Sequence, residues 1–421
     1  MIGIMGGSQE DVTRRGNGIL LIVGAASLFF LQSVSNGLLA ALPGLSEAFP
    51  QYSVDQVSML TSLVMVASIP TNIFCQAIIG RIGFKQTLFV AFALYFIGGL
   101  TPFFVRDNFA LIMVCRVVVG LAFGLFLPMA PTYAGAKFGE STRAKLLGWG
   151  GTLSGLSGMI HTQVGGILAN GDVWNVFLYH LLVLPVLVLA LFIPNLQRKA
   201  ARQLSQEDSA QESLEGKERG RIPALGWFVI VFAALSFFFI YPTLIYVSSI
   251  VVNTGMGDAA TAGTVTATFS LAGLLVGPTF GVFYKKLGLH TMTLSFAIAM
   301  AGMFCIGFGA SIPLLIAGSM LVGFGYTTIV TMAPMIYSIV CPGQLTFAVG
   351  LTNAASSALS FVSPFVYTFL SGFAGMEGDL RFSFYCGGTL LLASAVVIAI
   401  VLRRVGPSFG KGDGASADGA S

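Results

Sequence analysis

The sequence predicts an all-α integral membrane protein with twelve transmembrane helices in two pseudo-symmetric six-helix bundles. Of its 421 residues, 55% are hydrophobic and only 9% are charged, whereas a soluble domain has roughly a quarter of its residues charged. Apolar stretches long enough to cross a hydrocarbon layer about 30 Å thick recur along the chain. The expected spans are residues 18–46, 55–79, 86–105, 109–135, 145–170, 174–194, 224–252, 259–284, 290–309, 312–340, 345–372 and 382–402.

Two internal repeats indicate that the last six spans copy the first six. VVVGLAFGLFLPMAP begins at residue 117 in the fourth span, and MLVGFGYTTIVTMAP begins at residue 320 in the tenth. RIGFKQTL follows the second span and KLGLHTMTL follows the eighth. A parallel duplication relates two halves by an axis along the membrane normal. We therefore expect an N-terminal bundle at 1–195, a cytoplasmic linker at 196–221, a C-terminal bundle at 222–405 and a disordered tail at 406–421.

The basic residues predict that both chain termini lie in the cytoplasm. When the loops are assigned alternately to two sides, one side receives most of the lysines and arginines, and the other keeps Arg106 and Arg381. The positive-inside rule places the basic side in the cytoplasm. The formal net charge of +4 reflects this asymmetry, so it does not indicate a nucleic-acid partner. The expected setting is a bacterial inner membrane, with the protein as a monomer in the lipid bilayer.

The two basic, glycine-containing loops, the central linker and the six-plus-six spans resemble the major facilitator superfamily. Of the family's loop pattern G-x-x-x-D-R-x-G-R-K, the first loop keeps Arg81, Gly83 and Lys85, and the second keeps Lys286 and Gly288. Both loops lack the acidic residue, so a charge latch between the halves is not expected there. The resemblance implies a gating role for these residues, while a loop that merely follows the positive-inside rule is the alternative.

The fourth span adds to this resemblance, because Arg116 and Gly120 fit the family pattern R-x-x-Q-G. The resemblance implies a transporter whose halves rock about a central site and expose it alternately to each side. It also implies that helices one, four, seven and ten line the pathway. This selects as substrate-binding residues Arg116, Gln32, Asn36, Tyr241, Tyr246, Tyr326 and Thr327.

Arg116 is the one charged residue well inside an apolar span. Burying an arginine costs about 3 kcal/mol on insertion scales, so it needs a compensating partner. Two roles stay open: a hydrogen bond to carbonyls of the first span near Gln32 and Asn36, or direct contact with an anionic substrate. Gly120 and Gly124 share its helix face by 3.6-residue spacing. This small face is expected to admit a neighbouring helix or a ligand.

The acids and histidines limit how transport can be coupled. No aspartate or glutamate lies inside an expected span; all seventeen fall in loops, tails or helix ends, which argues against carboxylate-based proton coupling. His161 is expected at a depth similar to that of Arg116, and an imidazole titrates near neutrality. His161 is therefore the candidate proton- or pH-linked residue, with a packing role as the alternative. His180 and His290 are expected at the membrane interface.

One buried cation without a buried anion favours a secondary active transporter of a small organic anion, in particular a carboxylate. The alternative is an exporter of multiple drugs or lipophilic compounds, for which 36 phenylalanines and 15 methionines could build an adaptable apolar site. A sensor that binds solute without moving it is a further alternative. A co-transported or exchanged ion is a candidate partner. No enzymatic activity, cofactor or metal site is expected, because the spans contain no nucleophile–base pair or cluster of metal ligands.

Overall fold

The computed structural model describes residues 18–196, 222–341 and 344–409. Within these ranges every regular element is a helix. The expected linker, apart from Leu196, and the tail beyond Phe409 lie outside them. The first half contains α1 (Gly18–Ser27), η1 (Leu28–Ser33), η2 (Asn36–Ala41), α2 (Leu42–Ala48), α3 (Val54–Ile82), α4 (Phe84–Phe104), α5 (Phe109–Lys137), α6 (Glu140–Ala169), η3 (Val173–Val183) and α7 (Leu184–Phe192). The second half contains α9 (Ala224–Ile245), α10 (Val247–Asn253), α11 (Ala259–Leu287), α12 (His290–Gly307), α13 (Ile312–Val340), α14 (Leu345–Phe373) and α15 (Phe382–Phe409).

The helices are long and apolar enough to cross a membrane. Ten such segments occur in the described ranges, and the one at 259–307 contains both α11 and α12. α6 is a more polar helix of 30 residues that packs among them, so the structure is consistent with the twelve expected spans. Large apolar side chains such as Phe104 (77% exposed) and Phe373 (80% exposed) cover the outer surface. The chain is therefore a multi-pass integral membrane protein whose outer surface faces lipid.

Local sequence signals fix where the long helices begin and end. Ser53 and Gln56 form a capping box at the start of α3, which satisfies two backbone donors that the helix cannot use. Asp258 caps α11 by accepting from the backbone N–H of Thr261. Gly83 ends α3 and Gly288 ends α11 with φ angles of 101° and 54°. Glycine adopts such positive φ angles without the penalty that a Cβ would impose.

The first and sixth spans are wound irregularly. η1 and η2 occupy the middle of the first span, and all 11 residues of η3 form a 3-10 helix. Runs of 3-10 helix longer than three or four residues are uncommon, and a stretch in mid-helix often marks a hinge or a strained sequence. η2 and η3 both pack against α6. The irregular segments therefore lie beside the fifth span.

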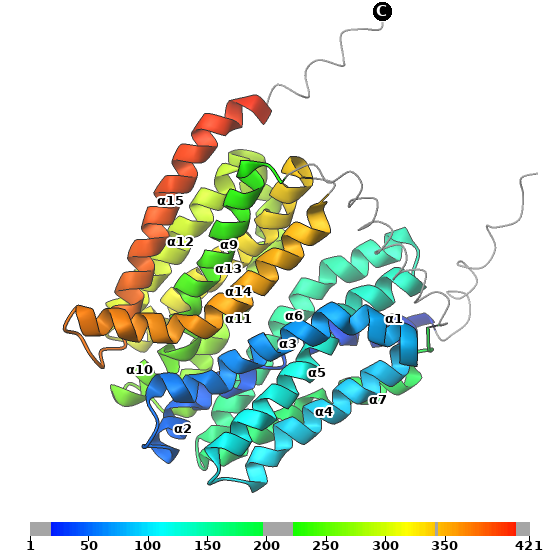
Figure 1. Ribbon diagram of the computed structural model, residues 1–421, viewed down its shortest axis with the longest axis horizontal. Coiled ribbons are helices and arrows are strands. Elements are labelled where there is room, and N and C mark those ends of the chain that lie inside the picture. The colour runs from blue at the N-terminus through cyan, green and yellow to red at the C-terminus, as the bar shows by residue number, and fades with distance from the viewer. Residues whose placement is uncertain (1–17, 197–221, 342–343, 410–421) are drawn as a thin grey trace, which may run out of the picture.

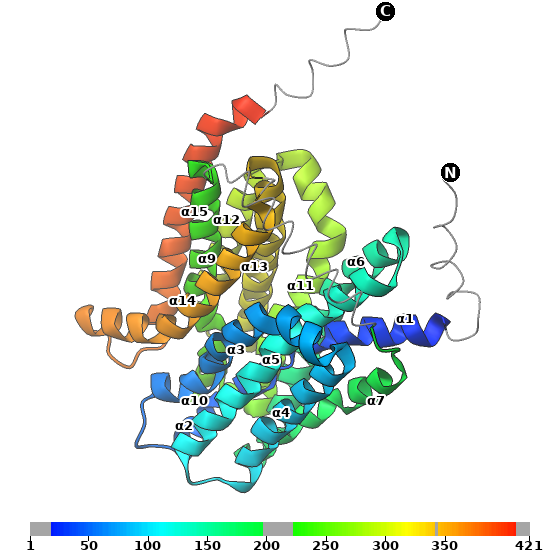
Figure 2. The same cartoon turned by 45° about the vertical axis from the view of Figure 1, so that its right-hand side comes forward.

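The two halves meet along two seams. Figure 1 shows the first half, from blue to green, at the lower right and the second half, from green to red, at the upper left. In the turned view of Figure 2 the two bundles are again distinct. α6 packs along α11, and α3 packs along α14. Both seams thus pair one helix of each half.

The seam between α6 and α11 closes at one end and opens at the other. A Cβ built at Gly155 would lie 2.8 Å from a leucine side chain of α11, and one at Gly166 would lie 2.5 Å from the Ala259 carbonyl oxygen. At Gly151 and Gly277, further along the two helices, a Cβ would meet no atom within 4 Å. We call the end where α3 and α11 begin the closed end. The halves diverge away from it.

Candidate functional site

A buried carboxylate joins the halves at the closed end. Asp55 lies in the first turn of α3 and is 8% exposed. It accepts a hydrogen bond of 2.6 Å from the Tyr246 hydroxyl, where α9 ends, and one of 2.5 Å from the Thr368 hydroxyl of α14. Hydrogen bonds to an ionised acceptor are the stronger kind. The first half thus holds two elements of the second through one side chain.

Further contacts cross between the halves at the same end. The Ser248 hydroxyl of α10 donates to the Leu39 carbonyl oxygen of η2 over 2.8 Å. Asp258 lies beside Asn170 at the end of α6. The exposed Asp258 carboxylate accepts hydrogen bonds from the backbone N–H and the hydroxyl of Thr261. These bonds lower the pKa of Asp258, and the backbone bond has the larger effect. Asp258 therefore remains an ionised cap at neutral pH.

At mid-depth the seam is lined by uncharged polar groups. Asn36 of η2 and Ser270 of α11 converge over Gly158 of α6: a Cβ there would lie 3.1 Å from Asn36 Nδ2 and 2.8 Å from Ser270 Oγ. Thr327 of α13 packs against Gly273 of α11: a Cβ built at Gly273 would lie 3.1 Å from Thr327 Oγ1. Amide and hydroxyl groups of both halves therefore meet at this level.

An aromatic stack lies in the second half next to these groups. The ring of Tyr326 on α13 is stacked on Phe237 of α9, with 5.1 Å between centroids, and on Phe269 of α11, with 6.1 Å. All three side chains are partly exposed. Tyr241 packs edge-on against Phe237 at 5.5 Å and reaches the α3 residues of the first half. The stack offers apolar faces that a solute can contact.

The structure separates the expected substrate-binding residues into three groups. Asn36, Tyr326 and Thr327 lie at the mid-depth seam. Tyr241 and Tyr246 are buried toward the closed end, where the Tyr246 hydroxyl donates a hydrogen bond to Asp55. Gln32 donates to the Leu127 carbonyl oxygen of α5 over 3.1 Å, and Arg116 is fully buried. The hydrogen bonds of these last two residues stay within the first bundle.

The expected gating residues lie around the two basic loops, at the ends of α3 and α11 away from the closed end. Arg81 and Lys286 are exposed. Lys85 donates to the Leu191 carbonyl oxygen of α7 over 2.7 Å, and its backbone N–H donates to Asn195. Both bonds stay within the first half. Gly83 and Gly288 supply the turns described above.

The small face of α5 packs against α3. A Cβ at Gly120 would lie 2.8 Å from the Val64 carbonyl oxygen, and one at Gly124 would overlap the Ser68 carbonyl oxygen. Close approach of two backbones is what small residues allow in membrane helices. This face thus contacts a neighbouring helix.

Arg116 points into the first bundle. Its side chain is fully buried, and its Nε donates to the Leu60 carbonyl oxygen of α3 over 2.6 Å. Its guanidinium interacts electrostatically with Tyr95 of α4 and with Tyr179 and His180 of η3. The terminal nitrogens Nη1 and Nη2 have no hydrogen-bond partner. The carbonyl that it binds belongs to the second span, whereas the sequence suggested carbonyls of the first.

Two histidines lie close to Arg116. His161 and His180 are both fully buried, and each uses Nδ1 to donate to a carbonyl of its own helix, at Ser157 and Phe177. The Tyr179 ring lies between them, 6.0 Å from the His161 ring and 4.0 Å from that of His180. The prediction of an interfacial His180 is wrong, because η3 turns this side chain into the bundle.

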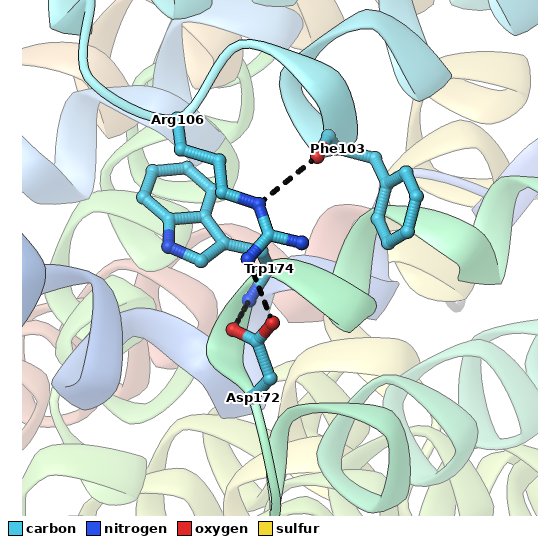
Figure 3. A network of polar contacts seen from close by, with 4 residues as sticks. All are labelled: Phe103, Arg106, Asp172 and Trp174. Atoms are coloured by element: carbon cyan, nitrogen blue, oxygen red, sulfur yellow. Dashed lines mark hydrogen bonds and ion pairs between the residues drawn. The ribbon is translucent and has the colours of Figure 1, made fainter.

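An arginine of the same half shows a different environment. Arg106, in the loop between α4 and α5, forms a 2.9 Å ion pair with Asp172, and both side chains are 42% exposed (Figure 3). Its Nε donates to the Phe103 carbonyl oxygen, and Asp172 also accepts from the backbone N–H of Trp174. This is the one ion pair among the residues that the structure describes.

Three groups at functional positions carry little signal in the sequence. Asp55 counts among the helix-end acids there, but in the structure its buried carboxyl group joins the two halves. The sequence does not single out Thr368, because it is one of several uncharged polar residues in its span. The buried position of Tyr179 depends on the 3-10 winding of η3, which the sequence does not predict. An acid within a capping box at the start of an apolar span is the one available signal for Asp55.

Comparison with known proteins identifies the fold. Residues 21–257 match the profile of the Major Facilitator Superfamily, which is more than half of the chain. No curated protein matches.

Solved transporter structures share the architecture over most of the chain. The nucleoside transporter NupG has a TM-score of 0.68 at 12% identity, covering 90% of this chain and 98% of its own. The POT family transporter PepTSo has 0.70 at 12%, covering 91% and 98%. The xylose transporter XylE from E. coli, in a partially occluded inward-open conformation, has 0.61 at 16%, covering 90% and 95%. At these identities the likeness concerns the fold alone.

Proposed function

The chain belongs to the Major Facilitator Superfamily, whose members are transporters rather than enzymes, and we propose that it moves a small organic solute by alternating access. The observation that carries the proposal is the one-sided contact between halves. Asp55 and Ser248 join them at the closed end, while α6 and α11 diverge beyond Gly151 and Gly277. Such a protein must break these contacts to expose its seam to the other side.

The loop charges support a cytoplasmic location for both termini, and we place the protein in a bacterial inner membrane. With that orientation the closed end faces outward, and the conformation described opens to the cytoplasm. Asn36 and Tyr326 at mid-depth would then be reached from inside. Import and export are equally compatible with this geometry, because both directions pass through an inward-open conformation.

A cross-link at the closed end tests alternating access. Cysteines at Leu39 and Ser248, joined by a short thiol cross-linker that a reductant can cleave, should stop solute flux in proteoliposomes while binding from the open side persists. Cleavage should restore flux. The matched control carries the Ser248 cysteine alone and should transport with or without the reagent. Full flux through the cross-linked protein would refute the proposal.

The seam favours a solute that is uncharged or lipophilic. Its mid-depth lining consists of amides, hydroxyls and the stacked rings of Phe237, Tyr326 and Phe269. Ligand pockets are commonly apolar with a few placed polar groups. An uptake screen in proteoliposomes that compares neutral, cationic and carboxylate solutes would test this substrate class. Uptake restricted to carboxylates would contradict it.

An organic anion, in particular a carboxylate, is the second candidate, and Arg116 supports it. Its two terminal nitrogens have no partner, and a planar guanidinium suits a carboxylate with two parallel bonds. The solute would have to reach Arg116 in another conformation. If it does, Arg116→Lys should weaken carboxylate affinity roughly tenfold or more, and Arg116→Gln should abolish it. Unchanged affinity in Arg116→Gln would leave the uncharged or lipophilic solute as the substrate class.

A further inference from the structure

We propose that the interior of the first bundle holds a small inorganic anion of the halide class, bound to the terminal nitrogens of Arg116. The site lies among α3, α4, α5, α6 and η3 and is separate from the seam between the halves. The proposal is compatible with an uncharged or lipophilic solute, and it is an alternative to a carboxylate solute that would use the same two nitrogens of Arg116. It concerns a resident ion that neutralises the buried arginine.

The donors for such an ion converge in one place. Nη1 and Nη2 of Arg116 and the hydroxyl of Tyr179 are buried and make no hydrogen bond of standard geometry, and both residues are 0% exposed. The Tyr179 hydroxyl lies within reach of the Arg116 guanidinium and interacts with it both electrostatically and as a hydrogen-bonding group. A guanidinium offers donors alone, and a tyrosine hydroxyl can donate. A halide, which accepts and never donates, satisfies all of these groups.

The charge of Arg116 argues for an anion in place of water. A buried charge is normally paired. The buried acid Asp55 already accepts from Tyr246 and Thr368, and in the described part of the chain the one ion pair belongs to Arg106. A water molecule could complete the hydrogen bonds of Arg116, but the charge of the guanidinium would stay uncompensated. An anion supplies both.

Close packing of the rings argues for an ion of one atom. A Cβ at Gly37 would overlap the Tyr179 ring, and one at Gly99 would overlap the His180 ring. The backbone therefore presses both rings against the cluster. A carboxylate or phosphate brings several atoms and would have to displace these closely packed rings to reach Arg116 in this conformation.

The titratable groups that interact with Arg116 are Tyr95 from α4, Tyr179 and His180 from η3, and Cys115 beside it on α5. α3 contributes a carbonyl oxygen, that of Leu60. Each of the two buried histidines uses Nδ1 to donate to a carbonyl of its own helix, so the Nε2 atom of the neutral ring is an acceptor and cannot bind an anion. The ion is therefore held by Arg116 and Tyr179.

The test uses purified full-length protein and replaces sodium gluconate by sodium chloride at constant ionic strength. Binding of an ion to the folded state raises the unfolding temperature saturably. We expect such a rise in the wild type, a roughly tenfold weaker apparent affinity in Tyr179→Phe, and no saturable rise in Arg116→Gln. Arg106→Gln is the matched control, because that arginine has its own carboxylate, and it should respond like the wild type. In crystals soaked in bromide, an anomalous peak should appear beside Arg116.

Three outcomes would overturn the proposal. Equal chloride responses in Tyr179→Phe and the wild type would show that the ion does not contact this cluster. A bromide map without a peak at Arg116 would do the same. An acetate response equal to that of chloride would refute the halide assignment. If Arg116→Gln does not fold, Tyr179→Phe and the bromide map still decide, since removing one hydroxyl keeps the ring packing.

Discussion

The third and fourth spans pack in the same way in both halves of the molecule. In the first half a Cβ at Gly98 of α4 would lie 2.7 Å from the Cys115 carbonyl oxygen of α5. In the second half a Cβ at Gly302 of α12 would lie 2.6 Å from the Gly318 carbonyl oxygen of α13. Each glycine thus lets two backbones meet, and the repeated sequence preserves the contact.

The second and fourth spans match as well. Gly120 of α5 contacts the Val64 carbonyl oxygen of α3, and Gly323 of α13 contacts the Phe269 carbonyl oxygen of α11. These two glycines hold the same place in the repeat. The halves therefore share the contacts that fix the distances between helices.

The halves differ in the side chain that they bury one helical turn before Gly120 and Gly323. Arg116 of α5 and Ser319 of α13 occupy matching positions, and both are fully buried. Arg116 is surrounded by Tyr95, Tyr179 and His180, whereas the Ser319 hydroxyl has no partner. A lone hydroxyl is far cheaper to bury than a cation. The comparison shows that a duplicated backbone can accept a charge on one side if its neighbours are polar there.

Ser319→Arg should have the largest effect, because it places a cation at a fully buried position where even the native hydroxyl has no hydrogen-bond partner. We expect a loss of about 3 kcal/mol from burying the charge, in addition to the strain of the longer side chain. The yield of monodisperse protein and its unfolding temperature measure this. Ser319→Ala is the control and should be as stable as the wild type. A stable Ser319→Arg would mean that the second half also compensates a charge.

Gly120→Leu should come next, because the added side chain would clash with the α3 backbone. Overpacking of this kind costs about 1–3 kcal/mol or more, so we expect poor folding or lost transport. Gly135→Leu on the same helix is the matched control, since a Cβ there meets no atom within 4 Å. Thermal unfolding and flux measured together would decide. Normal values for Gly120→Leu would remove the packing argument.

Asp55→Asn should weaken the closed end. The amide keeps one acceptor oxygen and loses the charge that strengthens both hydrogen bonds, each worth about 1.5–3 kcal/mol. A cysteine placed at Ser249, which is buried at this end, should then be labelled by a maleimide about tenfold faster. Asp107→Asn changes an exposed acid of the loop between α4 and α5 and should leave the rate unchanged. Equal rates in both variants would show that Asp55 does not hold the halves together.

Tyr326→Ala should have a smaller effect, confined to the solute. Loss of one aromatic contact is worth about 0.5–1.5 kcal/mol, so affinity for a solute identified by uptake should fall about twofold to tenfold. Tyr326→Phe keeps the stack with Phe237 and Phe269 and should stay within about twofold of the wild type. Binding to protein in detergent measures both. An unaffected Tyr326→Ala would place the solute elsewhere in the seam.

His161→Gln should have the smallest effect. Glutamine keeps a neutral polar group but cannot take up a proton, so any dependence of transport on pH that comes from protonation of His161 should be lost. Affinity at a fixed pH should change little. His290→Gln replaces an exposed histidine at the start of α12 and serves as the control. An unaltered pH profile in His161→Gln would leave this side chain a packing role.

The architecture is predictable because it depends on the average hydrophobicity of long segments and on repeated sequences. Hydrophobic length predicts spans, and the repeats at residues 117 and 320 predict two related halves. The side on which each residue lies around its helix is harder to predict. From sequence, Arg116 could bind either carbonyls of the first span or an anionic substrate. In the structure it donates to the Leu60 carbonyl oxygen of the second span, because its direction depends on how α5 is rotated against its neighbours.

The buried groups are less predictable for two physical reasons. His180 is misplaced from sequence since η3 winds more tightly than the α-helix that hydrophobic length suggests, which changes the direction of each side chain. The role of Asp55 depends on Thr368, which is 313 residues away in the chain. A contact of that range follows from the closure of the two halves and cannot be read from either span alone.

The 3-10 winding of η3 makes the sixth span longer than the same residues would be as an α-helix. A 3-10 helix rises about 2.0 Å per residue and an α-helix about 1.5 Å, so the 11 residues of η3 extend about 5 Å further than they would as α-helix. Rewinding η3 would shorten the span by about one turn of helix and rotate Tyr179 and His180 about its axis. A change in the winding of the sixth span would therefore move two neighbours of Arg116 together.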